Sequence, residues 1–292
     1  MSQVNNYPST NGFNSDDSVL ITGATSGLRR MPVSAFQDNV SVKAADLRAI
    51  MELCPPAISH RMIYRGKNLG TSFTTEQSQA VQNGTFTDMY VGDYWVINGK
   101  IRRIGDIDYF IHCGDNVDLD HHLLMVDDGA NLAGDGSTTH FMNDTDTTAG
   151  GFKGSKMWQS TIPNQILPGI TTAFGNHLLK HREFISNAVT NGVVTGGEWV
   201  DTIYNIFNEA MHYGTVVNGA NNAGAGVYNT GCSKNQIALF KFDQFSMNRK
   251  TNIWLRDVVS ASNFATVNGS GVAGSTNASH SGFSVLGYYL IH

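Results

Sequence analysis

Charged side chains are scarce in this chain of 292 residues. Asp, Glu, Lys and Arg together make up 15% of it, whereas an average globular domain has about 25%. The net charge is −5, and no run of Lys and Arg exceeds two residues. Because nucleic-acid binding requires a stripe of basic residues, we expect no nucleic-acid partner. The 31 glycines instead predict a folded protein with a neutral, turn-rich surface.

Cysteines and long apolar runs are also few. Cys54, Cys113 and Cys232 are far apart and form no Cys-x-x-Cys pair, so we expect neither a disulfide framework nor a cysteine-based zinc site. No apolar run approaches the roughly 20 residues that span a bilayer, which predicts no membrane insertion. The first residues lack a basic segment followed by an apolar one, so no secretory signal is expected.

The segment SVLITGATSGLRR at 18–30 is similar to the first strand and glycine turn of a dinucleotide-binding fold. That turn needs three glycines with separate roles. Gly23 and Gly27 fit, but Arg29 stands at the third position, and Pro32 would interrupt the helix that should follow. The pattern therefore favours a β-hairpin over 18–34, and we expect no cofactor.

The N-terminal region is predicted to be an attachment or oligomerisation segment. Residues 1–17 are polar, which is typical of an arm that becomes ordered on a partner. A helix is predicted over 41–53, where two prolines end it. Residues 1–56 are too few for a core of their own, so we expect the body of the protein over 57–292.

Several local signals organise this body. Thr74 with Gln77 three residues later forms a capping-box pattern that begins a short helix. Asn98-Gly99 between alternating apolar residues predicts a hairpin with a type I′ turn, and 123–127 predicts a buried strand.

Helices are predicted in the middle of the body and strands at its end. Residues 155–190 suggest short helices, and 198–213 has the clearest apolar stripe at helical spacing, formed by Trp199, Ile203, Ile206, Phe207, Ala210 and Met211. Four strand-like runs follow, at 236–242, 252–260, 264–269 and 283–291. Strands, then helices, then strands again predict an α+β fold.

Five segments carry a resemblance to a known family. They are the stretch IYRGKNLG…FIHCGD at 63–115, GGFKGSKMW, AFGNHLLKHREFISNAVTNG, GGEWVDTIYNIFNEAMHYG and KTNIWLRDVVSASNFATVNGSG. Together they cover about 60–272 and resemble the structural, fibre and minor structural proteins of tailed-phage virions. The N-terminal hairpin and helix resemble the particle-attachment segment of phage fibres.

The C-terminal part, NIWLRDVVSASNFATVNGSGVAG…GFSVLGYYLIH, resembles the end of C-type-lectin-like domains, where a Trp-Leu-Arg strand precedes a glycine-rich turn and a final strand. The resemblance implies a virion component that displays a C-type-lectin-like domain, commonly as a homotrimer. The Glu-Pro-Asn and Trp-Asn-Asp motifs of calcium-dependent lectins are absent, as are the paired cysteines of formylglycine-generating enzymes. Neither a calcium–sugar site nor that enzymatic activity is therefore expected.

Two histidine pairs and one acidic loop are candidates for metal binding. Near Asp118 and Asp120, the adjacent His121 and His122 would point to opposite faces of a strand. His177 and His181 have the spacing of a zinc pair on a helix, but Leu178 stands where a metalloprotease has its Glu. The loop 128–151 has many carboxylates and leaves a calcium site open. We predict no metal site from these patterns.

Four carboxylates could in principle cleave a polysaccharide: Glu183, Glu198, Asp201 and Glu209. Glu198 and Asp201 would lie near the start of the predicted helix, where its dipole stabilises anions. We therefore interpret them as capping residues and expect no enzymatic activity.

The last forty residues combine Asn, Ser and Gly with aromatic residues, as adaptable recognition surfaces do. We expect five residues at or near a receptor-binding face: Asn263, Asn268, Asn277, His280 and Tyr288. Three others are expected to be structural, with Arg256 in a buried ion pair to Asp257 or a helix carboxylate: Trp254, Arg256 and Asp257.

The resemblance to tailed-phage virion proteins implies a virion protein, a head or tail fibre or spike subunit that binds a glycan or surface protein of the host. It would contact other virion proteins through residues 1–56, form a homotrimer and be assembled into the virion in the host cytoplasm. Two alternatives stay open: a capsid decoration or connector protein without receptor binding, and a polysaccharide depolymerase.

Overall fold

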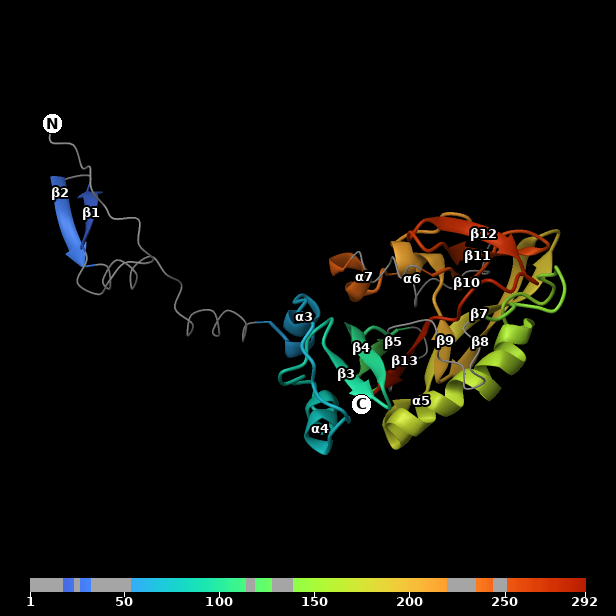
Figure 1. Ribbon diagram of the computed structural model, residues 1–292, viewed down its shortest axis with the longest axis horizontal. Coiled ribbons are helices and arrows are strands. Elements are labelled where there is room, and N and C mark those ends of the chain that lie inside the picture. The colour runs from blue at the N-terminus through green and yellow to red at the C-terminus, as the bar shows by residue number, and fades with distance from the viewer. Residues whose placement is uncertain are drawn as a thin grey trace. The chain divides into compact units, whose positions relative to one another are not determined.

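The computed structural model divides the chain into two units, Met1–Pro55 and Pro56–His292 (Figure 1). It describes residues 18–23, 27–32, 54–113, 119–127, 139–219, 235–243 and 251–292. The larger unit mixes helices and strands, and strands predominate, so the predicted α+β class is confirmed.

The N-terminal unit contains the predicted hairpin. Strands β1 (Ser18–Gly23) and β2 (Gly27–Pro32) pair antiparallel, with Gly23 opposite Gly27 at the turn. A dinucleotide-binding fold would have a helix where β2 lies, so the rejection of that fold is confirmed. The helix predicted over 41–53 lies outside the described residues.

The main sheet of the body has the C-terminal strand in its middle. Its order is β3-β4-β5-β13-β6, with β9 also paired to β13, and all these pairs are antiparallel. The sheet is curled into a half-barrel. The strands are β3 (Tyr94–Ile97), β4 (Lys100–Ile107), β5 (Leu123–Asp127), β6 (Leu178–Leu179), β9 (Tyr204–Ile206) and β13 (Gly287–Ile291).

The remaining strands of the body form a second antiparallel sheet and a hairpin. The three-stranded sheet has the order β10-β11-β12, and β7 and β8 form a long hairpin. Their bounds are β7 (His181–Thr190), β8 (Val193–Thr202), β10 (Ile253–Val258), β11 (Asn263–Val267) and β12 (Ala273–Asn277). Strands β10 and β11 match predicted runs, whereas β12 was not predicted, because its small polar residues lack an apolar alternation.

The helices are short. They are α3 (Pro56–Arg61), α4 (Thr75–Gln82), the π-helix η1 (Met157–Ile166), α5 (Leu167–Phe174), the 3-10 turn η2 (Gly175–His177), α6 (Glu209–Tyr213) and α7 (Ala238–Phe242). The predicted capping box of α4 is confirmed, because Thr74 accepts from the Gln77 backbone and Gln77 Oε1 accepts from the Thr74 backbone. The Asn98-Gly99 turn is confirmed as well, since both residues have positive φ, 53° and 73°.

The helix predicted over 198–213 is wrong. Residues up to Thr202 belong to β8, where Glu198 pairs with Ile185 and Thr202 with His181, and only α6 is helical. The helical apolar spacing was overridden by strand pairing. Of the apolar stripe, Ile206 on β9, Phe207 after it and Met211 on α6 are buried, so three different parts of the chain bring these residues into the core. The helices predicted over 155–190 are correct only as far as η2, after which β6 and β7 begin.

A second correction concerns the apolar run at 236–242. It was predicted as a strand but forms α7, with Ala238, Leu239 and Phe240 buried. Short apolar runs do not distinguish a strand from a buried helix. A third concerns Cys113, which takes part in a disulfide, whereas the wide cysteine spacing predicted none. Folding brings together residues that are distant in the sequence.

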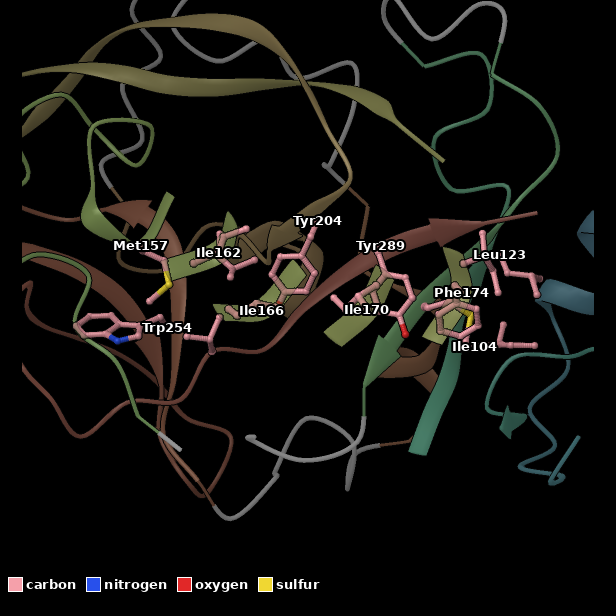
Figure 2. Close-up of a cluster of buried hydrophobic side chains, with 14 of the residues drawn as sticks. Ile104, Leu123, Met157, Ile162, Ile166, Ile170, Phe174, Tyr204, Trp254 and Tyr289 are labelled. Carbon is pink, nitrogen blue, oxygen red and sulfur yellow. The ribbon is translucent and has the colours of Figure 1, made fainter. Parts of the chain in front are cut away.

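The core lies between the main sheet and the helices η1 and α5. In Figure 2, Ile166 and Phe174 of these helices lie beside Tyr204 of β9 and Tyr289 of β13. The rings of Phe174 and Tyr289 are 5.5 Å apart. Trp254 of β10 is also fully buried in this cluster. The core thus fixes the three-stranded sheet to the rest of the body.

Candidate functional site

The structure divides the five predicted binding residues among three places. Asn263 and Asn277 are register partners at one end of the β11–β12 pair. Asn268 lies in the turn at the other end, where its Oδ1 accepts from the backbone of Ser270 and Val272. Tyr288 is fully buried. The predicted face therefore does not exist as one surface.

Tyr288 is a correction to the predicted binding face. It lies on β13, an interior strand of the main sheet with β5 on one side and β6 and β9 on the other, and every residue of that strand is buried. Its hydroxyl donates to Glu183 Oε2 at 2.6 Å and accepts from Arg256 Nη1 at 2.9 Å. An aromatic residue in a Gly- and Asn-rich tail suggested exposure, but the pairing of its strand places it in the core.

The Asn277 end of β12 meets a segment from much earlier in the chain. The Asn143 N–H donates to the Ala278 carbonyl and the His140 N–H to the Phe283 carbonyl, both at 2.9 Å. The segment 140–143 therefore runs alongside 278–283. The Trp254 indole N–H donates to the His140 carbonyl at 2.7 Å, which ties this segment to the core.

Asp146 connects the two segments through its side chain. Its Oδ2 accepts from Asn277 Nδ2 at 2.8 Å, and its Oδ1 accepts from the backbone N–H of Ser279 at 3.2 Å. The Ser279 hydroxyl also donates to Oδ1. These hydrogen bonds, chiefly those from Ser279, lower the pKa of Asp146. The carboxylate thus stays ionised and holds both residues in place.

Each of the two segments carries one exposed ring. His280 is exposed, its Nδ1 accepts from the Gly282 N–H at 2.9 Å, and its ring packs edge-on against Phe283 at 5.2 Å. Phe141 is exposed, with the Lys156 ammonium 5.9 Å from its ring centre. Lys156 is itself paired with Asp144.

We call the group Phe141, Asp146, Asn277, Ser279 and His280 the Asn277 surface. It offers an apolar ring face, an imidazole, an amide, a hydroxyl and a carboxylate. Its hydrogen bonds within the protein orient these groups before any ligand arrives, so little conformational entropy would be lost on binding. Sequence reasoning missed Phe141 and Asp146, because they lie in a polar loop whose only recognised signal was calcium binding.

The three predicted structural residues are buried: Trp254, Arg256 and Asp257. Arg256 forms an ion pair with Glu183 at 2.7 Å. Glu183 lies on strand β7, so this partner is a strand carboxylate and not the helix carboxylate that the sequence suggested. Asp257 instead accepts the Glu209 backbone N–H at 2.6 Å, at the start of α6.

Glu183 is the centre of a buried network that joins four strands. Besides Arg256 and Tyr288, its carboxylate accepts from Asn205 Nδ2 at 3.1 Å and lies 2.8 Å from His181 Nε2. Burial by itself raises the pKa of Glu183, but the charge of Arg256 and the hydrogen bond from His181 outweigh it and hold the pKa well below its usual range.

The other three candidate carboxylates also have protein partners. Glu198 and Asp201 both lie on strand β8. Glu198 forms an ion pair with Lys153, and Asp201 forms one with Arg182 at 2.7 Å. Their prediction as helix-capping residues is wrong, because β8 is a strand. Glu209 is buried and accepts the backbone N–H groups of Val217, Asn218 and Gly219, which shapes the turn after α6.

The histidine pairs do not converge. His121 contacts Asp108 at 2.7 Å, while the buried His122 accepts from the Phe110 N–H and contacts the Asp120 carbonyl. Burial lowers the pKa of His122 to about 4. His177 and His181 lie on η2 and β7, not on one helix as expected.

Within the described ranges, no group of three or more His, Cys, Asp or Glu side chains could hold a metal ion. Asp118 and residues 128–138 of the proposed calcium loop lie outside those ranges. In the rest of that loop, Asp144 and Asp146 are engaged by Lys156, Asn277 and Ser279. None of the helices that the structure describes has the length and apolar character of a membrane span.

A pocket of about 470 Å³ lies elsewhere, between η1 and the β8–β9 region. Trp158, Ile162, Pro163 and Leu167 form part of its lining, and Lys180 and Asp201 also line it. None of the predicted binding residues reaches it. The Asn277 surface is therefore the candidate site that sequence and structure share.

Comparisons with known proteins give no further guidance. No protein-family model, no curated protein and no solved structure matches this chain.

Proposed function

We propose that this chain is a virion protein of a tailed phage, a head or tail fibre or spike subunit that binds a host receptor. Residues 1–56 attach it to other virion proteins and assemble copies of the chain into a homotrimer. The body displays the Asn277 surface to a glycan or protein of the host cell. The protein is assembled into the virion in the host cytoplasm. Its action is binding and not turnover.

The single observation that supports receptor binding most directly is the Asn277 surface. Its side chains come from segments about 130 residues apart in the chain, yet Asp146 joins them through three hydrogen bonds. A rigid surface with one exposed aromatic ring and several small polar groups has the composition of known recognition surfaces. Several copies on one particle would multiply weak contacts by effective concentration.

We further propose that the body is a variant of the C-type-lectin-like fold. The order of elements supports this proposal, because the Trp-Leu-Arg strand β10 is followed by the turn 268–271 and the chain ends in β13. The long β7–β8 hairpin and the π-helix η1 are features of this body for which we claim no counterpart in that fold.

The burial and ion pairing of the candidate carboxylates favour a binding function over a depolymerase. Glycoside cleavage needs two carboxyl groups that both reach the substrate. Glu183 is fully buried with both oxygens engaged, and Glu198 and Asp201 are paired with basic side chains. These contacts suit structural roles.

Adsorption of the fluorescently labelled full-length chain to a panel of candidate bacterial hosts tests the proposal. We expect adsorption of the wild type to one host, and a loss of about tenfold for Asn277→Ala combined with His280→Ala, the scale of a binding hot spot. Val272→Ser is the matched control, because Val272 is exposed at the opposite end of β12. Periodate treatment of the cells abolishes adsorption if the receptor is a glycan, and protease treatment abolishes it if the receptor is a protein.

Adsorption that is equal for the wild type and the double variant would overturn the assignment of the Asn277 surface. No adsorption to any host of a phage whose virion contains the chain would overturn receptor binding and favour a decoration protein. Release of sugars from host polysaccharide, lost in Glu198→Gln but retained in Val272→Ser, would favour the depolymerase, because Glu198 is partly exposed and its replacement leaves the buried network intact.

A further inference from the structure

The first helix of the body exposes its large apolar residue. Helix α3 has no fully buried residue, and only the small Ala57 packs against the core. Ile58 is 55% exposed, and Met62, Ile63 and Tyr64 directly after the helix are exposed as well. A helix on a protein surface normally turns its large apolar side chains inward. In α3, Ile58 faces outward.

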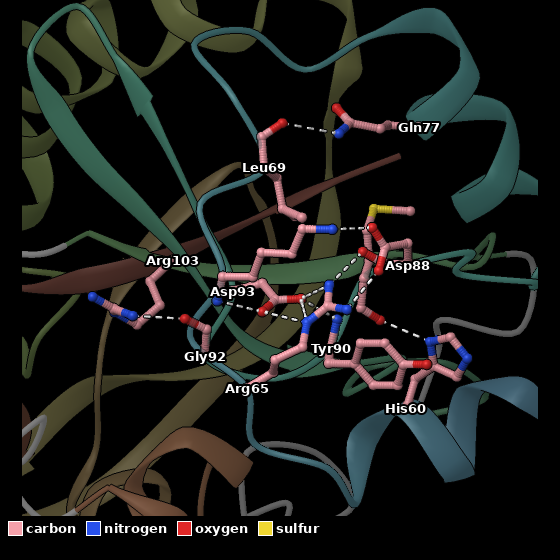
Figure 3. Close-up of polar contacts among 11 residues, drawn as sticks. His60, Arg65, Leu69, Gln77, Asp88, Tyr90, Gly92, Asp93 and Arg103 are labelled. Atoms are coloured by element: carbon pink, nitrogen blue, oxygen red, sulfur yellow. Dashed lines mark hydrogen bonds and ion pairs between the residues drawn. The ribbon is translucent and has the colours of Figure 1, made fainter. Parts of the chain in front are cut away.

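Polar contacts hold α3 in this orientation. Arg61 donates to the fully buried Asp106 at 3.1 Å. His60 Nδ1 contacts the Met89 carbonyl at 2.7 Å, and its ring stacks on Tyr90 at 4.3 Å. Figure 3 shows His60 on its helix, directed toward Tyr90. The helix is therefore anchored through its basic residues, which leaves Ile58 and Met62 facing outward.

Helix α7 extends the exposed apolar area. Asp106, which binds Arg61, also accepts the Ala238 N–H at the start of α7 at 2.9 Å. Tyr64 donates to Asp243, the residue after the exposed Phe242, at 3.1 Å. We call Ile58, Met62, Ile63, Tyr64 and Phe242 the α3 patch. It contains five of the eight exposed large hydrophobic residues in the described part of the chain.

Charged residues beside the patch are paired with one another. Arg65 binds Asp93 at 2.7 Å and also Asp88, and Lys67 binds Asp88 from the other side. Figure 3 shows these contacts as one network. Both signs of charge are thus present and mutually neutralised, so this rim favours neither a nucleic acid nor an anionic membrane. With two basic and two acidic side chains at its rim, the patch is self-complementary in charge: two copies can bring their apolar centres together without facing like charges.

The patch also begins where the N-terminal unit ends. Helix α3 starts at Pro56, the first residue after that unit. If residues 1–55 bring copies of the chain together, each copy tethers its own α3 patch at high effective concentration to the others. Isolated monomers rarely expose a contiguous apolar cluster of this kind without a partner.

We propose that the α3 patch is a contact between copies of this chain, in which Ile58 and Met62 of one copy pack on the same patch of another. This inference rests on the part of the proposed function in which the N-terminal unit assembles copies, and it is independent of receptor binding. The partner is a second copy because the patch is self-complementary and each patch is covalently linked to the assembling unit.

Sedimentation of the full chain over a range of concentrations, together with hydroxyl-radical footprinting of Met62, tests the proposal. We expect an oligomeric wild type and at least about tenfold weaker association for Ile58→Ser combined with Met62→Ser, from the lost burial of large apolar side chains. In the Ile58→Ser single variant, Met62 should oxidise several times faster than in wild-type oligomers. Val217→Ser and Val272→Ser remove equally exposed side chains (54% and 58%) outside the patch and should change neither result.

A monomeric wild type would overturn both this inference and the proposed assembly through the N-terminal unit. An oligomeric wild type whose Met62 oxidises at the same rate in Ile58→Ser would overturn this inference alone. Protection of Met62 in purified virions but not in the purified oligomer would also overturn it, since the patch would then contact another virion protein.

Discussion

Replacing Arg256 with methionine should destabilise the body by about 3–5 kcal/mol, because the change leaves a buried carboxylate without its cation. Arg256 Nη1 lies 2.7 Å from Glu183 Oε2, and both side chains are almost fully buried. Methionine has a similar length and no charge, so the loss is mainly electrostatic. At about 2–4 °C per kcal/mol for a domain of this size, the Tm should fall by roughly 6–20 °C.

Two further variants separate this cause from a general loss of packing. Arg182→Met breaks an ion pair with Asp201 in the same hairpin, but both side chains are about half exposed, so the expected cost is about 0–1 kcal/mol. Adding Glu183→Leu to Arg256→Met removes the unpaired charge and should recover much of the loss. Urea denaturation followed by circular dichroism measures all four proteins.

In the Arg256→Met variant, the pH dependence that Glu183 contributes to the free energy of unfolding should also change sign. In the wild type the pKa of Glu183 is held below its usual value, because the charge of Arg256 and the hydrogen bond from His181 outweigh burial. Its contribution to stability is therefore present above about pH 4.5 and is lost as the pH falls further. Without Arg256, burial should raise this pKa, so the variant should lose stability as the pH rises from 4.5 to 7. An Arg256→Met protein no less stable than Arg182→Met, with the wild-type pH slope, would refute the reasoning.

Two other predictions concern His122 and Gly287. Burial lowers the pKa of His122 to about 4. Its contribution to the free energy of unfolding is therefore present above about pH 6.5 and is lost as the pH falls toward 4, by about 3 kcal/mol. Urea denaturation at pH 7 and 4.5 should show this loss in the wild type but not in His122→Gln, and an equal loss in both proteins would contradict the assignment. A Cβ on Gly287 would lie 2.1 Å from the Asn205 carbonyl oxygen, so Gly287→Ala should disrupt the β9–β13 pair and cost at least about 1–3 kcal/mol. Gly274→Ala is its control, with 3.4 Å to the nearest atom; equal Tm values for the two variants would contradict the packing.

Local chemistry alone determined several elements. Asn and Gly adopt positive φ more readily than other residue types, so the dipeptide Asn98-Gly99 was enough to predict the type I′ turn and its hairpin. The Thr74–Gln77 capping box needs only four consecutive residues. The order of alternating and helical runs also gave the α+β class, although the runs at 198–213 and 236–242 were each assigned to the wrong type of element.

Strand pairing decided what local patterns could not. The segment 198–213 has a helical apolar spacing, yet its first residues find partners in β7, and the hydrogen bonds of that hairpin stabilise a strand. The residues before Tyr288 have the composition of a surface tail, but Tyr288 lies on an interior strand of the main sheet. No window of neighbouring residues contains the information about which strand lies beside another.

The candidate site depends on the same long-range information. Asn277 and His280 were predicted from the sequence, but Asp146, which orients Asn277, is 131 residues away along the chain. The sequence does not reveal the α3 patch either. Apolar residues on a helix predict burial, whereas here the contacts of His60 and Arg61 with distant residues fix the orientation of the helix. Sequence patterns report what each segment prefers by itself. Which side chains meet, and which face remains uncovered, follows from the balance of contacts over the whole fold.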